Sequence, residues 1–416
     1  MRGSAGRVSK SVLLISYFYP PMPGAGSVRP GRLAKMLPQL GWVPTTLTGP
    51  WRGAGSEYGE VVALTPFGDP LAARIRGMWR LTPPARWLPG AIHAALSLAA
   101  SRHFDAVVSI SNPVFNHLVA SIVARQSGLP WLADYSEAWT GNLFSPKKGI
   151  ALPFNRLLET RSMRNASAMS CATPGISRLL SKLHGRHDVE IIENAVDFSE
   201  WERIPNLPPP KFTFLFAGML WGGRLSPEIL FAAVAKLRRA GHPAGAAARF
   251  EFYCSEHRIV SEAARRLGVR DAVILHDVTL REHVLHAERR AAALIILFPM
   301  RPISVVPSKL YEFYGARRPI LAIGPAQSKA ELGGLIEGNR LGHFATTESE
   351  CAAAICELYE RFIDGVYETD PNPQWSPPTA EAAAARFAGL LDRITGCPFP
   401  RAPAAVRDAC ANHKTC

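Results

Sequence analysis

Lys309 and Glu312 are the residues whose types and spacing point most directly to chemistry. They follow the apolar run Ala292–Phe298, which predicts a buried strand, and Pro307, which predicts the first position of a helix, where a missing N–H costs nothing. The free N–H groups of a first helical turn attract anions, and Lys309 adds a full positive charge there. Glu312 lies three residues further and projects from the same helix face. A cation for phosphate beside a carboxylate for sugar hydroxyls predicts a nucleotide-sugar site. The alternative is an ordinary strand–helix unit with a solvated Lys–Glu pair.

A glycine-containing turn near the start of the chain is a second candidate site. Gly24 and Gly26 follow the predicted strand Ser11–Tyr17, at the carboxyl edge of a sheet, where α/β proteins bind their ligands. Without Cβ atoms, they let the backbone approach a phosphate or sugar closely, and Ser27 is placed to cap the next helix. The alternative is a merely tight turn. The spacing is not the dinucleotide fingerprint, so we exclude NAD binding.

A similar turn occurs in the second half of the chain. Gly218 ends a predicted strand, and Arg224 follows in a Gly-rich loop. There Arg224 could clamp a diphosphate, whose charge grows as the leaving group departs. The alternative is a structural arginine.

Composition limits the class of protein. The chain has 416 residues, 47% of them hydrophobic and 19% charged, which suits two packed domains. No apolar run approaches the ~18–20 residues of a membrane span, and we expect no signal peptide. The seven cysteines are odd in number and lack a Cys-x-x-Cys pair. We therefore expect a cytoplasmic protein without a disulfide framework or zinc site.

Positive charge is concentrated in the first half. Residues 1–190 carry 21 Lys/Arg and 9 Asp/Glu, net +12, so the remainder carries 13 − 12 = +1. Basic residues interleaved with Trp are typical of a segment that rests on an anionic membrane surface. The alternative is a solvated basic face; no nucleic-acid motif accompanies the charge, so we expect no nucleic-acid partner. The segment Leu71–Phe104 has no acidic residue and contains Arg74, Arg76, Arg80, Arg86 and Arg102 with Trp79 and Trp87.

Short β-branched runs alternate with helical stretches along both halves, which predicts an α/β fold with parallel, doubly wound sheets. The predicted strands are Ser11–Tyr17, Val43–Leu47, Ala106–Ile110, Trp131–Asp134, Ala166–Ala172, Glu190–Glu193, Phe212–Ala217, Arg249–Cys254, Val273–His276, Ala293–Phe298 and Pro319–Ile323. The predicted helices are Val28–Leu40, Asn116–Gln126, Pro227–Ala240, Ile259–Leu267, Ser308–Gly315 and Ala380–Ile394.

A proline-dense stretch separates the two patterns and reads as a linker. We predict an N-terminal domain over residues 1–195 and a C-terminal domain over residues 205–375. Residues 376–395 should form a helix that folds back towards the first domain. Residues 396–416 are expected to be a flexible tail.

Four sequence blocks, in this order, resemble the group 1 (glycogen-synthase-like) retaining glycosyltransferases, and more narrowly the bacterial subgroup that builds cell-surface polysaccharides. The blocks are Val12–Pro30, Ser111–Asn142, Phe216–Arg224 and Val305–Glu312. The resemblance implies a GT-B fold, with two Rossmann-like domains facing a central cleft. It implies that the first domain binds the acceptor and the second an NDP-sugar, with no cofactor. No Asp-x-Asp motif precedes the donor strands, so we expect no essential metal.

The resemblance also implies roles for individual residues. Asp134 and Glu137 would position the acceptor, with His117 as a third candidate, although a buried histidine on a helix face is more often structural. Two positions depart from the family: Ser304 replaces a glutamate that normally touches the donor sugar, and Ser136 lies in a block whose arginine is lost. The implied donor-binding residues are Gly24, Gly26, Gly218, Arg224, Ser308, Lys309 and Glu312.

Two other classes of function remain open. One is a GT-B sugar-nucleotide epimerase, which needs no acceptor. The other is a non-catalytic glycosyltransferase-like partner subunit, which the Ser304 and Ser136 departures favour. For an active transferase, the acceptor would be a glycan or a lipid-linked sugar, and the protein would sit on the inner face of the plasma membrane.

Overall fold

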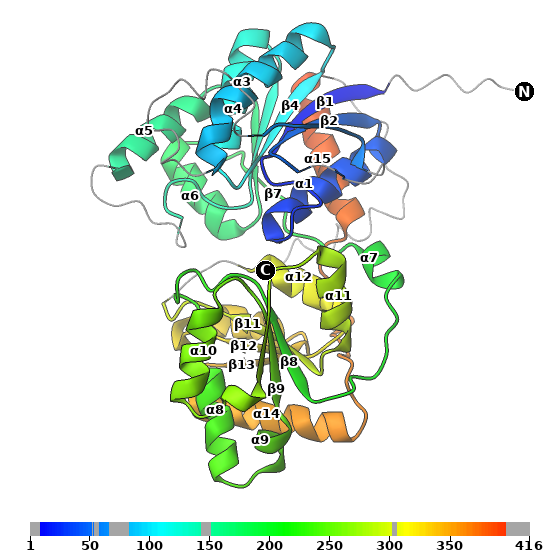
Figure 1. The fold of residues 1–416 in the computed structure, drawn as a ribbon. Coiled ribbons are helices and arrows are strands. Elements are labelled where there is room, and N and C mark those ends of the chain that lie inside the picture. Colours follow the sequence, from blue (N-terminus) through cyan, green and yellow to red (C-terminus); the bar gives the residue numbers. More distant parts are fainter. Residues whose placement is uncertain are drawn as a thin grey trace, which may run out of the picture. The chain divides into compact units, whose positions relative to one another are not determined.

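The computed structural model describes residues 9–51, 53, 58–65, 83–142, 151–301 and 306–396. The chain divides into two compact α/β units. The first unit comprises residues 1–22, 26–194 and 378–416, and the second comprises residues 23–25 and 195–377. Each unit is built on one parallel sheet flanked by helices (Figure 1).

The first sheet has seven strands in the order β3-β2-β1-β4-β5-β6-β7. The order reverses between β1 and β4, which is the place where an open α/β sheet binds ligands at its carboxyl edge. The strands are β1 (Lys10–Ile15), β2 (Trp42–Thr48), β3 (Glu60–Ala63), β4 (Ala106–Ser111), β5 (Trp131–Tyr135), β6 (Ala168–Cys171) and β7 (Glu190–Ile191). The helices are α1 (Ala25–Met36), α3 (Pro83–Ser101), α4 (Phe115–Ser127), α5 (Ala151–Met163), α6 (Pro174–His184) and α15 (Ala380–Thr395).

Both faces of the first sheet are buried, which explains the continuous apolar run of β1. Side chains alternate along a strand, so Leu13 and Ile15 pack on the face covered by α3 and α4. Val12 and Leu14 pack on the other face, against α1 and α15. Because successive side chains of β1 point to opposite faces of the sheet, this one strand contributes to two separate hydrophobic cores.

The last helix, α15, is part of the core of the first unit. Its Phe387 and Leu391 are buried among residues of β1 and β4. Asp392 on the same helix accepts a hydrogen bond from Trp42 Nε1 at 3.2 Å and pairs with Lys10 Nζ at 2.5 Å. Residues from the two ends of the described chain are thus joined within one unit.

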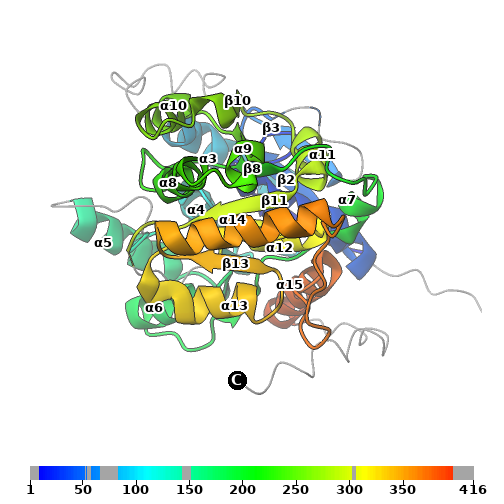
Figure 2. The same ribbon diagram turned by 90° about the horizontal axis from the view of Figure 1, so that it is seen from below.

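The second sheet has six strands in the order β10-β9-β8-β11-β12-β13. Helix α14 lies along it (Figure 2). The strands are β8 (Thr213–Ala217), β9 (Arg249–Tyr253), β10 (Val273–His276), β11 (Ala293–Leu297), β12 (Ile320–Ile323) and β13 (Gly342–Ala345). The helices are α7 (Phe198–Glu202), α8 (Glu228–Arg239), α9 (Pro243–Ala247), α10 (His257–Arg266), α11 (Arg281–Arg290), α12 (Ser308–Ala316), α13 (Gly334–Glu337) and α14 (Glu348–Ile363).

The prediction that Trp87 enters a lipid interface is wrong, and the contact of the rest of the Arg- and Trp-rich segment with a membrane stays a prediction. Residues 71–82, which include Trp79, lie outside the described residues. Helix α3 is a core helix: Trp87 is 1% exposed, and its Nε1 donates to the Thr48 carbonyl at 3.1 Å. Trp87 therefore cannot enter a lipid interface without unfolding this core. In the part of the chain that the structure describes, every helix is too short or too polar to cross a bilayer.

Candidate functional site

Asp134, at the end of β5, is completely buried and does not face solvent. Arg29 of α1 binds it with two bonds, from Nε to Oδ2 at 2.7 Å and from Nη2 to Oδ1 at 2.9 Å. Ser170 Oγ donates to Oδ1 at 2.8 Å. Such a paired, buried carboxylate holds α1 against β5 and β6. The geometry favours this positioning task over the predicted direct contact with an acceptor.

Arg29 is a residue that sequence reasoning missed. Besides pairing with Asp134, it donates to the carbonyls of Ile192 at 2.7 Å and Glu193 at 3.2 Å. Its guanidinium lies 5.2 Å from the Phe387 ring of α15. Arg29 follows directly after the predicted glycine turn and cap in the sequence, and that position was the available signal. One guanidinium thereby connects α1, β5, the segment after β7 and α15.

Glu137 lies in the loop after β5 and is only partly buried. Its Oε2 accepts hydrogen bonds from Asn112 at 3.3 Å and Asn142 at 3.1 Å. Ser111 fixes the backbone of the same residue, donating to its carbonyl at 2.9 Å. Burial raises the pKa of Glu137, and the Asn142 bond opposes that shift. Of the three predicted catalytic residues, Glu137 is the one that is partly exposed, whereas Asp134 and His117 are fully buried.

His117 lies in the core of the first unit and is 0% exposed. Its Nδ1 is 2.8 Å from Ser109 Oγ, and Trp131 Nε1 donates to the same hydroxyl at 2.8 Å. The Ser109 hydroxyl has two acceptor lone pairs, so it can accept from Trp131 and also pair with His117 Nδ1, while His117 Nε2 is buried without a hydrogen-bond partner among the described residues. Burial lowers the pKa of His117 to about 3. The neutral, inaccessible ring favours a structural role.

The first glycine turn needs glycine for two different reasons. Gly24 has φ +112°, which side chains rarely adopt. A Cβ on Gly26 would lie 3.0 Å from the Phe18 ring. The predicted cap is wrong: α1 already begins at Ala25, and Ser27 Oγ donates to the Met22 carbonyl at 2.7 Å.

In the second unit, the loop after β8 carries Gly218 and Arg224, both exposed. The left-handed backbone lies further along, at Gly222 (φ +67°) and Gly223 (φ +85°), while a Cβ on Gly218 would make ordinary contacts. Glu256, which sequence reasoning missed, closes this loop. Its carboxylate accepts from the Gly222 N–H at 2.6 Å and from the Leu220 N–H.

Ser308, Lys309 and Glu312 begin α12, just after the segment that follows β11. Pro307 has extended backbone (ψ 142°) and precedes the helix, so its predicted place at the first helical position is wrong by one residue. Residues 302–305, and with them Ser304, lie outside the described residues.

Lys309 and Glu312 belong to a buried charge cluster. Lys309 Nζ binds Glu288 at 2.8 Å and also Glu312. Arg281, the first residue of α11, donates to Glu312 Oε2 at 2.5 Å and to Glu200 at 2.8 Å. The sequence predicted that Lys309 and Glu312 share one helix face. It did not predict the other three members of the cluster, which are Glu200, Arg281 and Glu288.

The cluster sets the protonation of its carboxyls. Burial alone would raise the pKa of Glu312, but Arg281 and Lys309 outweigh it and hold this pKa well below the usual value. Burial, reinforced by the Glu312 charge, raises the pKa of Glu288 well above its usual value. Glu312 is therefore an anion at neutral pH, flanked by two cations beside the first turn of α12.

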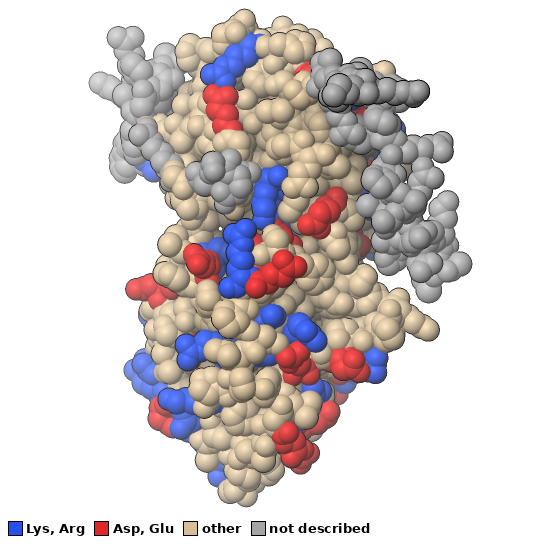
Figure 3. All heavy atoms as spheres, turned by 90° about the vertical axis from the view of Figure 1, so that its right-hand side faces the viewer, with Lys and Arg blue, Asp and Glu red and all other residues tan. Residues whose placement is uncertain are grey.

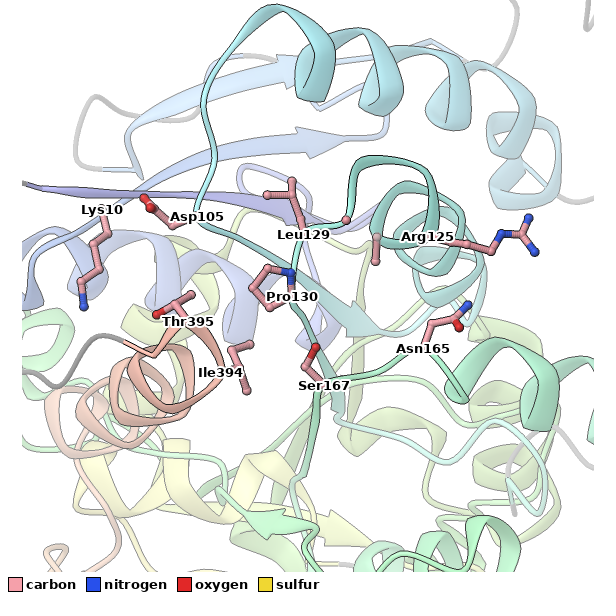
Figure 4. A pocket seen from close by; sticks show the side chains of 11 residues that line it. Lys10, Asp105, Arg125, Leu129, Pro130, Asn165, Ser167, Ile394 and Thr395 are labelled. Carbon is pink, nitrogen blue, oxygen red and sulfur yellow. The ribbon is translucent and has the colours of Figure 1, made fainter.

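A hollow of about 610 Å³ lies elsewhere in the first unit (Figure 4). It is lined by Lys10, Asp105, Pro130 and Ser167, which lie at the amino-terminal edge of the sheet, and by Ile394 of α15. Asp134 and Glu137 come from the opposite, carboxyl edge. In Figure 4 the Arg125 side chain points away from the other lining residues. None of the predicted site residues lines this hollow.

A similarity to a known protein family lies in the first half of the chain. Residues 24–195 match the family described as Glycosyl transferase 4-like domain. No curated protein sequence matches the chain significantly.

Solved structures match both units. Sucrose-phosphate synthase from Thermosynechococcus elongatus aligns with a TM-score of 0.64 at 14% identity, covering 93% of this chain and 96% of that one. Anabaena HepE in complex with UDP-glucose aligns with a TM-score of 0.58 at 14% identity, covering 96% and 99%. A proposed UDP-N-acetylglucosamine 2-epimerase from Listeria monocytogenes aligns with a TM-score of 0.58 at 13% identity, covering 94% and 98%. The chain therefore has the GT-B fold, and its residues 24–195 are similar to the glycosyl transferase 4-like domain.

Proposed function

We propose that this protein is a retaining, metal-independent glycosyltransferase that moves a sugar from an NDP-sugar to a glycan or lipid-linked acceptor in polysaccharide or glycoconjugate synthesis. The observation that carries the proposal is the cluster at α12, where Lys309 and Arg281 flank the ionised Glu312. The glycosyl transferase 4-like domain and the alignment with HepE bound to UDP-glucose support it.

In the donor half, Lys309 and the exposed Arg224 would neutralise the diphosphate as the glycosidic bond breaks. The first-turn amides of Ser308 and Lys309 would add partial positive charge. Glu312 would accept hydrogen bonds from the ribose. Because Lys309 is already bound to Glu288 and Glu312, a phosphate would have to draw its Nζ partly away from these carboxylates.

In the acceptor half, Glu137 is the residue we assign to the reacting hydroxyl. Its raised pKa makes the ionised carboxylate a stronger base, able to accept the proton of the acceptor hydroxyl, and the Asn112 and Asn142 bonds fix its orientation. In front-face attack the leaving phosphate also helps to deprotonate the acceptor, so no enzymic nucleophile is needed. Asp134 would act through Arg29, by holding α1 and its glycine turn in place.

The donor assignment is tested by a thermal-shift screen with UDP-, GDP- and dTDP-sugars, because a ligand bound only by the folded state raises its stability. One nucleotide class should stabilise the protein. Arg224→Ala and Lys309→Ala should each weaken its binding by about tenfold to a hundredfold, the worth of a charge-assisted phosphate contact. Arg265→Ala, an exposed arginine on α10, is the matched control. Unchanged affinity in both test variants would remove the donor assignment.

The epimerase is the second candidate, favoured by the alignment with the Listeria protein. Turnover of an NDP-sugar alone, without release of the nucleotide, would establish it. A transferase must instead release the nucleoside diphosphate only when an acceptor is present. A chelator that abolished activity, with recovery only on adding a divalent cation, would overturn metal independence.

A further inference from the structure

Helix α5 presents large apolar side chains to solvent. Leu152, Phe154 and Leu157 are 41%, 64% and 55% exposed. Phe154 and Leu157 are three residues apart, so they share one face. The opposite face is buried and includes Glu159 and Met163. The packing of α5 therefore leaves an apolar face without a partner among the described residues.

The charge around this apolar face has one sign. Residues 151–184 contain five Lys/Arg and a single acidic residue, Glu159, which is 0% exposed. The five basic side chains are all exposed, and none has an ion-pair partner among the residues that the structure describes. They are Arg156, Arg161 and Arg164 on or directly after α5, and Arg178 and Lys182 on α6.

The position of α5 makes this surface accessible to a large partner. Figures 1 and 2 both show α5 at the outer edge of the first unit, with α6 next to it. The right-hand side of Figure 1, away from α5, shows Lys/Arg and Asp/Glu interspersed (Figure 3). The exposed charged side chains of α5 and α6 are thus all basic, whereas those on the face in Figure 3 have both signs.

We propose that the exposed face of α5, with the basic side chains of α5 and α6, docks the protein onto an anionic lipid bilayer. Arg161 lies four residues after Leu157 and shares its face, and a helix that presents apolar and basic side chains together suits the interface between headgroups and acyl chains. Phe154 and Leu157 would enter the interface while the basic residues meet lipid phosphates. The inference rests on the proposed function only in that a lipid-linked acceptor would lie in the same bilayer. Docking itself requires no turnover.

The test is co-sedimentation of the full chain with vesicles of phosphatidylcholine, alone or mixed with phosphatidylglycerol. We expect binding to the anionic vesicles only, weakening as salt screens the charges. Each basic residue near such a surface is worth about fivefold in partitioning. Arg156→Ala combined with Arg161→Ala should therefore lower binding by at least about tenfold, and Phe154→Ser with Leu157→Ser should lower it at every salt concentration. Arg265→Ala and Ile363→Ser, an exposed apolar residue on α14, are the matched controls.

Several results would overturn the proposal. The wild-type chain should pellet with the anionic vesicles, and equal or negligible binding to both vesicle types at low salt contradicts docking. Unchanged binding of the two double variants would place the contact elsewhere. If Phe154→Ser with Leu157→Ser instead turns a dimer into a monomer in light scattering, the face joins two copies of the chain. Nucleotide-induced thermal shifts, measured without vesicles, report separately on the proposed function.

Discussion

At the scale of the residue, two carboxylates three positions apart have opposite environments. Asp134 is fully buried and paired with Arg29, whereas Glu137 is partly buried and has no cationic partner among the described residues. The family resemblance implied that both carboxylates would position the acceptor. It could not distinguish them, because Arg29 is 105 positions away from Asp134. Only the folded sheet brings that guanidinium to one carboxylate and not the other.

We predict that Asp134→Asn lowers the free energy of unfolding by about 3–5 kcal/mol, because it leaves Arg29 as an uncompensated buried charge. Glu137→Gln should leave stability unchanged or slightly higher, since burial disfavours the charge it removes, but it should slow transfer to the acceptor. Urea unfolding and activity assays on both variants check this. Equal stability losses would mean that the two carboxylates share one task.

His117 gives a prediction about pH. The unfolded chain binds a proton on this histidine below about pH 6.5, while the folded protein does not until about pH 3. The unfolded state therefore binds more protons in this window, and stability falls with falling pH at roughly 1.4 kcal/mol per unit. His117→Asn should remove that slope between pH 6 and 4. His93→Asn, on the exposed face of α3, is the control and should retain it. If the free energy of unfolding of the His117→Asn protein depends on pH as steeply as that of wild type, then His117 in the folded protein binds its proton as readily as it does in the unfolded chain.

At the scale of the element, the sequence located the central strands and the edge strands β7 and β10, but not the edge strands β3 and β13. β11 was predictable because its five residues are all buried and apolar. β3 and β13 were not predicted, since each is a four-residue strand whose pairing with β2 or β12 supplies the order. Gly342 in β13 is an example. A Cβ there would lie 2.0 Å from the Ile320 carbonyl of β12, so the glycine is required by the neighbouring strand and not by any pattern within β13.

Helix α3 shows how one pattern fits two structures. An arginine–tryptophan alternation is expected of an interfacial helix and equally of a core helix whose tryptophan faces inward. The burial of Trp87 against the end of β2 shows that α3 is a core helix. The sequence alone does not show whether the Trp87 face of α3 contacts a membrane or the protein core, and only the folded structure distinguishes the two.

For α15 we predict that Leu391→Ala lowers the free energy of unfolding of the first unit by about 2–5 kcal/mol, the range for removing a buried leucine side chain. Ile363→Ala, 62% exposed on α14, should change stability by no more than about 0.5 kcal/mol. Urea unfolding of the full chain measures both. A Leu391→Ala protein as stable as wild type would mean that α15 adds little to the first core.

At the scale of the whole molecule, the order of the sequence blocks predicted the GT-B fold, while the pairings inside each site were beyond prediction. Lys309 and Glu312 share a helix face, so their proximity follows from spacing. Arg281 and Glu200 are 81 positions apart and meet only because α7 and α11 both pack near α12. The residues that tune a carboxylate thus come from elements that no local pattern connects.

The place of α15 also constrains how the protein is made. The ribosome delivers the first sheet early, yet one of its faces waits for Phe387 and Leu391, which follow the whole second unit in the sequence. The second unit has all of residues 195–377 before that helix emerges. The usual N-terminal-first order of co-translational folding is therefore reversed, and the earlier unit is completed last. A chain cut short after residue 377 would keep a finished second unit but leave the face of Val12 and Leu14 without its α15 cover, and proteases and chaperones recognise such apolar surfaces. Completion of the first unit thus requires that the whole second unit has already been synthesised.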